Sequence, residues 1–338
     1  SLGEALSLQL SLLQSTPSLQ LVSNSSTAKF TEQVSPTIAL DRKSCMEFAI
    51  GKISRVLGPA FTPIDENPTR VRLPDEPLML VDRIVSIEGD ALSMGSGRVI
   101  TEHDIHHGAW YLDAGRIPTC IAVEAGQADL FLSGYLGIDL EAKGLAVYRL
   151  LDAEITFHNP MPGTGQTIRY DIHIDHFFRQ GKTWLFRFNF EGTVNGITLL
   201  TMKNGCAGFF TQSELDAGKG IILTAMDTQS VAGKRPNDWI DFVQMMCESY
   251  NDTQLSALRS GDLVSCFGRT FSNLPLQNLD CLPGERMTLV NRVLKIDPVG
   301  GRFGLGMITG EADIHEQDWF LTCHFIDDQV MPGTLMYE

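Results

Sequence analysis

The stretch PDEPLMLVDR at residues 74–83 returns as PGERMTLVNR at residues 283–292, an offset of 209 residues. Two further segments repeat in the same order: DIHHGAW at 104–110 returns as DIHEQDW at 313–319, and IPTCIAVE at 117–124 returns as MPGTLMYE at 331–338. The last pair has an offset of 214, so the second copy holds five extra residues between its tryptophan and its proline. Self-similarity that keeps its register is the signature of duplication, and we interpret the chain as two diverged copies of one unit.

The first copy has the pattern of a long helix followed by an antiparallel sheet. Residues 119–136 are mostly apolar, contain no proline and start just after Pro118, which predicts one helix. Apolar and polar residues then alternate, which predicts strands at residues 168–174, 184–190 and 199–210. The Asn195-Gly196 pair before the last strand predicts a two-residue hairpin.

Composition and repeats together divide the chain into four parts. We expect a linker at 1–40, a first unit at 41–211, a second linker at 212–237 and a second unit at 238–338. The first unit continues for some ninety residues after Glu124, whereas the sequence stops at Glu338, the matching position of the second. The second unit is therefore expected to be truncated.

Charge, hydropathy and cysteine usage exclude several classes of protein. The net charge of −15 argues against nucleic acid as a partner, because phosphate binding favours a basic surface. No apolar run is long enough for a membrane span, and no basic residue precedes Lys29, unlike a secretory signal. The seven cysteines are scattered without a CxxC pair, which favours reduced thiols over disulfides or a metal site. A cytoplasmic protein is expected.

The segment CHFIDDQVMPGTLMYE at residues 323–338 carries the motif for chemistry. His324 precedes Glu338 by fourteen residues, and Met331-Pro332-Gly333 lies between them. This segment resembles the active loop of the hot-dog beta-hydroxyacyl-acyl-carrier-protein dehydratases, in which His-Phe is followed by Met-Pro-Gly and then by an acid at that spacing. The tandem arrangement is similar to the dehydratase region of bacterial polyunsaturated fatty acid synthases.

The resemblance implies an α+β fold, a double hot-dog in which an antiparallel sheet wraps around a long central helix and whose second copy is truncated. It implies an enzyme, a 3-hydroxyacyl-[acyl-carrier-protein] dehydratase (a lyase) of fatty acid or polyunsaturated fatty acid biosynthesis, with or without isomerisation of the new double bond. The substrate would be carried on the phosphopantetheine of an acyl carrier protein, with no cofactor or metal. The other implied partners are further domains of a synthase polypeptide, the two units would form a pseudo-dimer, and the chain itself could form a homodimer.

The same resemblance assigns roles to residues. In the family, the histidine of one unit faces the acid of its partner, so His324 would pair with Glu124 of the first unit. Imidazole can remove a proton near neutral pH, and a carboxyl group buried among apolar groups can donate one. Glu338 is the matching acid, but the first unit has no histidine in the corresponding segment. One working site per pair is expected, and Glu338 is a third candidate catalytic residue, which would act if sites combined residues from different chains.

The remaining motif residues are expected to hold the substrate. Gly333 is the candidate donor to the thioester oxygen, since a Pro-Gly step that opens a helix leaves backbone N–H groups free. Phe325, Met331 and Pro332 are expected to line the substrate site.

Two other functions remain open. A hot-dog thioesterase would use the same fold for hydrolysis, although thioesterases of this fold lack the histidine-to-acid spacing around Met-Pro-Gly. A non-catalytic acyl-binding or scaffold module would explain the first unit without histidine. Other polar residues near the motifs are expected to have structural rather than catalytic roles. We interpret Asp327 and Asp328 as solvated turn residues, Cys323 as a packed thiol, and His106 and His107 as loop residues.

An acyl carrier protein is usually acidic, and so is this chain, so docking would need a local basic patch. The candidates are Arg169, Arg179, Lys182 and Arg187.

Overall fold

The computed structural model describes residues 40–338 except 221, 241–246 and 273–284. Nearly all of the predicted first linker therefore lies outside the described residues. No helix in the described ranges is long and apolar enough to cross a membrane.

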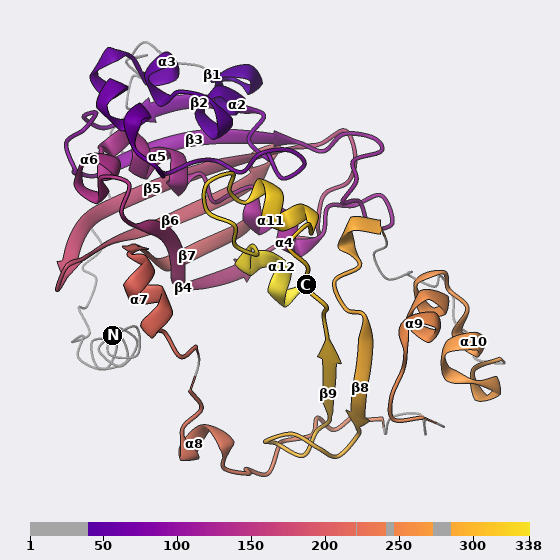
Figure 1. The fold of residues 1–338 in the computed structure, drawn as a ribbon. Coiled ribbons are helices and arrows are strands. Elements are labelled where there is room, and N and C mark those ends of the chain that lie inside the picture. Colours follow the sequence, from indigo (N-terminus) through magenta and orange to yellow (C-terminus); the bar gives the residue numbers. More distant parts are fainter. Residues whose placement is uncertain (1–39, 221, 241–246, 273–284) are drawn as a thin grey trace, which may run out of the picture.

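Seven antiparallel strands form one sheet in the order β1-β2-β3-β5-β6-β7-β4 (Figure 1). The strands are β1 (Leu40–Asp41), β2 (Arg83–Glu88), β3 (Gly97–Asp104), β4 (Val147–Phe157), β5 (Thr167–Gln180), β6 (Thr183–Val194) and β7 (Ile197–Phe210). The predicted alternation is confirmed, because one set of side chains on β5 and β6 is buried in the main core: Ile168, Tyr170, Ile172, Ile174, Phe186, Phe188 and Phe190. The predicted hairpin is also confirmed, since Asn195 and Gly196 have φ of 51° and 78° between β6 and β7.

The central helix is interrupted, and the prediction of one helix through residues 119–136 was wrong. The structure has α4 (Thr119–Glu124) and α5 (Asp129–Leu136), separated by a turn that begins at Ala125. A Cβ added to Gly126 would lie 2.6 Å from Cζ of Phe190, so the backbone of this turn lies directly against a core ring. Glycine is a poor helix former, and the turn uses tighter hydrogen bonds three residues apart, such as that from Gly126 N to Val123 O. The break therefore falls immediately after Glu124.

Short helices precede and follow the strands of the sheet along the sequence. They are α2 (Arg42–Ile50), α3 (Ile53–Leu57), the 3₁₀ helix η1 (Pro59–Glu66), α6 (Ile138–Ala142), α7 (Gln212–Ala217) and α8 (Ala225–Thr228). The later part of the chain contains α9 (Asp252–Arg259), α10 (Leu263–Phe267), η2 (Arg269–Phe271), η3 (Glu285–Met287), β8 (Arg292–Asp297), β9 (Met307–Glu311), α11 (Trp319–Cys323) and α12 (Gly333–Tyr337).

The later part of the chain is divided between two cores. Helices α11 and α12 lie beside α4, and Phe320, Phe325 and Leu335 belong to the main core (Figure 1). The separate hairpin β8–β9 and helices α9 and α10 enclose only a small cluster, which includes Tyr250 and Leu255. The last segment of the sequence, which contains α11 and α12, is therefore packed into the main core.

Segments that repeat in the sequence make matching contacts in the structure. Trp110 Nε1 donates to Pro77 O at 3.0 Å, and Trp319 Nε1 donates to Arg286 O at 3.0 Å. An arginine at the end of each repeated stretch binds two acids in or just after the following strand: Arg83 binds Glu102 and Asp104, and Arg292 binds Glu311 and Asp313. Each of these pairs of contacts is related by the offset of 209 residues.

Candidate functional site

The structure brings His324 and Glu124 together, although 200 residues separate them in the sequence. His324 Nε2 lies 3.6 Å from Glu124 Oε1, and the two side chains are only 12% and 5% exposed. His324 follows the last residue of α11, and Glu124 is the last residue of α4. The contact therefore joins one residue from each predicted unit.

The backbone fixes which nitrogen of His324 carries a proton. Nδ1 lies 2.9 Å from Val330 O, and a carbonyl oxygen can only accept, so Nδ1 must be the donor. In the neutral imidazole the free lone pair is then on Nε2, the nitrogen that faces Glu124. The Phe325 ring, whose centroid is 4.1 Å from that of the imidazole, covers one side of it. His324 is thus oriented to remove a proton through Nε2.

Thr334 holds the other carboxylate oxygen of Glu124. Its hydroxyl donates to Oε2 at 2.5 Å, and both side chains are buried. This leaves Oε1 directed to His324. Thr334 was missed in the sequence, where the only signal for it is its place immediately after Met-Pro-Gly, at the start of α12.

Glu338 occupies the corresponding place at the end of α12. Its Oε2 accepts from Thr119 Oγ1 at 2.8 Å and from Cys120 N at 3.1 Å, both in the first turn of α4. Within the part of the chain that the structure describes, Glu338 forms no ion pair with a histidine. Glu338 therefore satisfies the free N–H end of a helix, which is a stabilising place for a carboxylate.

The predicted substrate-holding residues lie in the same segment as His324, and Phe325 contacts the imidazole directly. Gly333 is the first residue of α12, and a Cβ there would meet only Met336 Cε at 3.9 Å, so the space in front of its backbone is open. Phe325 and Pro332 are buried, and Met331 is half-buried against the main core. The exposed Gly333 thus directly precedes Thr334, the residue that holds Glu124.

Comparison with models of protein families identifies the family of the chain. The model of the FabA-like domain matches residues 73–203 and 282–338, which is more than half of the chain. The chain belongs to the FabA-like family.

A related protein agrees with that assignment. The FabA-like chain is 36% identical over 308 residues to a polyunsaturated fatty acid synthase subunit from Thraustochytrium sp.. The match covers 89% of this chain and 20% of the relative. The chain thus spans about a fifth of that relative's length.

Two solved structures are weaker matches. The dehydratase heterocomplex ApeI:P of Xenorhabdus doucetiae has 20% identity and a TM-score of 0.32, covering 46% of this chain and 95% of its own. A probable thioesterase of Bartonella henselae has 12% identity and a TM-score of 0.27, covering 34% and 93%.

In this FabA-like chain, the loop after His324 is ion-paired, and the interpretation of Asp327 and Asp328 as solvated turn residues was wrong. Asp327 Oδ2 lies 2.6 Å from Arg72 Nε, and Asp328 binds both terminal nitrogens of Arg149 at 2.6 and 3.0 Å. The partners lie some 180 to 255 residues earlier, in the segment predicted to form the first unit. Sequence spacing carries no signal for such long-range pairs.

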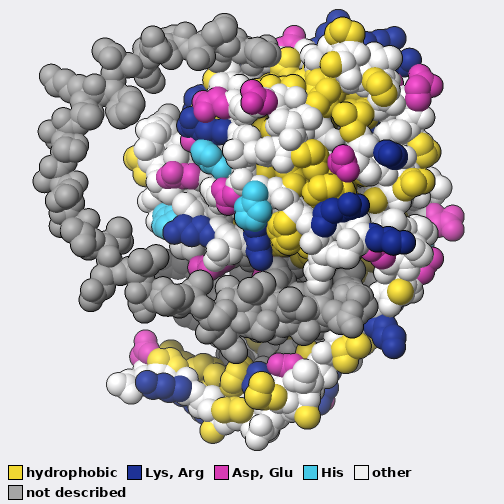
Figure 2. All heavy atoms as spheres, turned by 90° about the vertical axis from the view of Figure 1, so that its left-hand side faces the viewer, with side chains coloured by type: hydrophobic (Ala, Val, Ile, Leu, Met, Phe, Trp, Pro, Cys, Tyr) yellow, Lys and Arg dark blue, Asp and Glu magenta, His cyan; other side chains and the backbone are white. Residues whose placement is uncertain are grey.

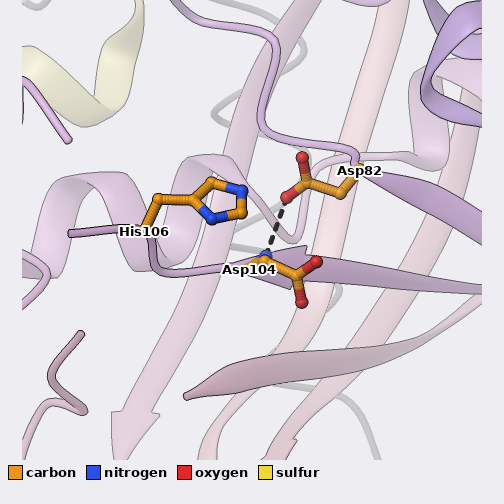
Figure 3. A group of neighbouring side chains, drawn as sticks. All are labelled: Asp82, Asp104 and His106. Atoms are coloured by element: carbon orange, nitrogen blue, oxygen red, sulfur yellow. Dashed lines mark hydrogen bonds between the residues drawn. The ribbon is translucent and has the colours of Figure 1, made fainter. Parts of the chain in front are cut away.

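The group Asp82, Asp104 and His106 resembles a metal site, since one ligand atom of each lies within 4.8 Å of the others (Figure 3). Its two carboxylates already have cationic partners. Asp82 pairs with Arg42, and Asp104 binds Arg83, whose hydrogen bonds lower the pKa of Asp104 to about 2. The two aspartates thus form ion pairs with arginines of α2 and β2, and their geometry alone does not indicate a metal site.

Two further features of the FabA-like chain bear on the site. Cys323 is buried, which confirms that it is a packed residue, and burial raises its pKa to about 12, which favours the thiol over the thiolate. A hollow of about 870 Å³ lies on β4 to β7 and is lined by polar and apolar side chains, including His173, Phe188 and Phe190. None of the predicted site residues lines it, so the pairing of imidazole and carboxyl defines the site better than cavity size.

Proposed function

We propose that this FabA-like chain dehydrates 3-hydroxyacyl thioesters to 2-enoyl thioesters at the contact between His324 and Glu124. The single observation that carries the proposal is the 3.6 Å approach of His324 Nε2 to Glu124 Oε1 in a nearly buried setting. A base and an acid so placed can act on neighbouring carbons of one substrate.

In the proposed reaction, His324 Nε2 takes the proton from C2 of the substrate. Electrons of the broken C–H bond form the C2–C3 double bond, and the C3–O bond breaks. Protonated Glu124 supplies the proton that turns the departing hydroxyl into water. The proton on His324 then returns to Glu124, which restores both groups.

The surroundings assist each part of this reaction. The bond from Nδ1 to Val330 O keeps the proton off Nε2 in the neutral imidazole, and it stabilises the imidazolium that forms. The Thr334 hydroxyl orients Glu124. The backbone N–H of Gly333 is the proposed donor to the thioester oxygen as negative charge develops on it. Phe325, Met331 and Pro332 are proposed to line the acyl site.

The proposal includes two units of unequal role, a double hot-dog with residues 41–211 as the first unit and 238–338 as part of the second. The matching contacts of Trp110 and Trp319 support it. Glu338, which lacks a histidine partner among the described residues, is proposed to hold α4 rather than to transfer protons.

The proposed substrate carrier is the phosphopantetheine arm of an acyl carrier protein, within a synthase for fatty acids or polyunsaturated fatty acids. A cytoplasmic location and further synthase domains as partners belong to the same proposal. The predicted basic patch is partly occupied, because Arg169 pairs with Glu102 and Arg179 stacks on Trp184. On the face drawn in Figure 2, acidic, basic and histidine side chains are interspersed. Docking would therefore depend on local pairs rather than on a field of one sign.

The test is to incubate the chain with a 3-hydroxyacyl thioester and follow the enoyl absorbance and the free thiol together. Dehydration predicts enoyl absorbance without thiol release. Thiol release without enoyl product would indicate a thioesterase, and neither signal would indicate a binding or scaffold module.

A further inference from the structure

The loop that carries His324, residues 324–332 (the His324 loop), is fastened to the first unit by two ion pairs. Asp327 pairs with Arg72, and the side chains are 14% and 13% exposed. Asp328 pairs with Arg149 through two hydrogen bonds, and these side chains are 13% and 24% exposed. Pairs this sheltered are less screened by salt than surface pairs, and the two-pronged contact also fixes orientation.

Both arginines are themselves held by the frame of the first unit. Arg72 Nη1 donates to Ala49 O at 2.9 Å, at the end of α2. Arg149 Nη1 donates to Tyr148 O at 2.6 Å on β4, and the Tyr148 hydroxyl donates to buried Asp129 on α5 at 3.0 Å. The arginines are therefore fixed points for the loop and not mobile surface chains.

A short chain of hydrogen bonds leads from these aspartates to the imidazole. Phe325 N donates to Asp328 O at 2.7 Å, which ties the start of the loop to the residue held by Arg149. Val330 N donates to His324 O at 3.0 Å, and His324 Nδ1 donates back to Val330 O. A displacement of Asp328 would therefore shift the backbone on which His324 sits.

The two ion pairs occur on the side that has the histidine. The second repeat has five more residues than the first between its tryptophan and its proline, and Asp327 and Asp328 lie in this longer segment. At the offset of 209 residues, Arg72 corresponds to Cys281, so this arginine is not repeated. The first unit contributes the arginines, and the second contributes the loop that needs them.

We propose that Arg72 and Arg149 are positioning residues, which hold the His324 loop through Asp327 and Asp328 so that Nε2 meets Glu124. The expected effect on kcat rests on the proposed dehydration, whereas the role of the arginines in holding the loop does not. Misplacing a reacting group by about 1 Å costs on the order of 10²-fold in rate. Releasing the loop should therefore lower kcat, while the rest of the acyl site keeps KM within about threefold.

The experiment compares Arg149→Gln and Asp328→Asn with the unchanged protein in the full chain. Arg149→Gln should lower kcat about tenfold to 10²-fold, and Arg149→Lys, which keeps the charge but not the two-pronged contact, should recover part of it. Arg292→Gln is the matched control, because Arg292 also binds two acids but lies on the β8–β9 hairpin, and it should leave kcat unchanged. Asp328→Asn breaks the same ion pair from the loop, so it still tests the proposal if a change at Arg149 on β4 disturbs folding.

Amide hydrogen exchange, measured on the same proteins, tests the fastening without any turnover. Exchange should speed up in residues 324–332 of Arg149→Gln and Asp328→Asn and stay unchanged in α4 and the sheet. Unchanged exchange in the loop, or unchanged kcat despite faster exchange, would overturn the positioning role. If the unchanged protein forms no enoyl product, the proposed dehydration fails, and the exchange comparison alone still decides whether the arginines hold the loop.

Discussion

Helices α4 and α12 begin and end alike, but the carboxyl groups at their ends have different neighbours. Each helix follows a proline and ends near a glutamate, and each glutamate contacts the first turn of the other helix. Glu124 also faces His324, whereas Glu338 satisfies the N-terminal turn of α4. The same crossing of helices thus yields a pair suited to proton transfer on one side and a structural contact on the other.

The difference arises from the loop and not from the acids. The second repeat has a longer segment before its proline, and that segment brings His324 and the two aspartates that fasten it. Two similar helix ends therefore differ through a local extension of the sequence. Changes on the two sides should have unequal effects, which makes the comparison testable.

Removing the imidazole should have the largest effect. His324→Gln should lower kcat by about 10³-fold, within the range of general acid–base catalysis, because no other described side chain faces Glu124 as a base. Steady-state turnover of a 3-hydroxyacyl thioester measures this. Circular dichroism should match that of the unchanged protein, and retained turnover would erase the proposed difference between the two sides.

Loosening Glu124 should have a smaller effect. Thr334→Val removes the hydroxyl donor at nearly constant shape and should lower kcat about twofold to tenfold, since a hydrogen bond between neutral groups contributes about 0.5–1.5 kcal/mol. Thr334→Ser keeps the hydroxyl and serves as the control. Equal rates for the valine and serine variants would show that Glu124 does not depend on this contact.

The pH dependence of the free energy of unfolding should reveal Asp129, a buried acid near the proposed site. Burial raises the pKa of Asp129 to about 8, so the folded protein keeps this proton at pH values where the unfolded chain, near 3.8, has lost it. Its contribution to stability is then present in full below about pH 4 and falls as the pH rises toward 8, by at most about 1.4 kcal/mol per pH unit. Asp129→Asn should flatten the fall in unfolding free energy between pH 5 and 8. An unchanged slope would contradict a protonated Asp129.

The smallest effect is expected for Glu338, the carboxylate at the end of α12. Glu338→Gln weakens the interaction of a carboxylate with the first turn of α4 and should lower the free energy of unfolding by about 0.5–1 kcal/mol. Thermal unfolding measures it. A loss of several kcal/mol would mean that this side is more than a helix-end contact.

Much of the fold could be predicted because its signals are local. The alternation on β5 and β6 and the Asn195-Gly196 turn depend only on neighbouring residues, and both were confirmed. The break after Glu124 could not be predicted, because it depends on Gly126 meeting the Phe190 ring of a distant strand.

The site divides in the same way. His324 and Glu124 could be named from the spacing of the motif and the repeat, and their catalytic roles stay predictions. The contact of Thr334 with Glu124, and the pairs formed by Asp327 and Asp328, join segments about two hundred residues apart. Nothing in the local sequence specifies such partners, since they arise only when the last segment packs into the main hydrophobic core.

The most direct measurement of the central claim is the turnover of Glu124→Gln and Glu338→Gln on the same 3-hydroxyacyl thioester. The two changes are chemically identical and lie at matching positions of the repeat. We predict that Glu124→Gln lowers kcat at least about 10²-fold, as expected for loss of a general acid, while Glu338→Gln stays within about threefold of the unchanged protein. Equal losses, or a larger loss for Glu338→Gln, would contradict the account.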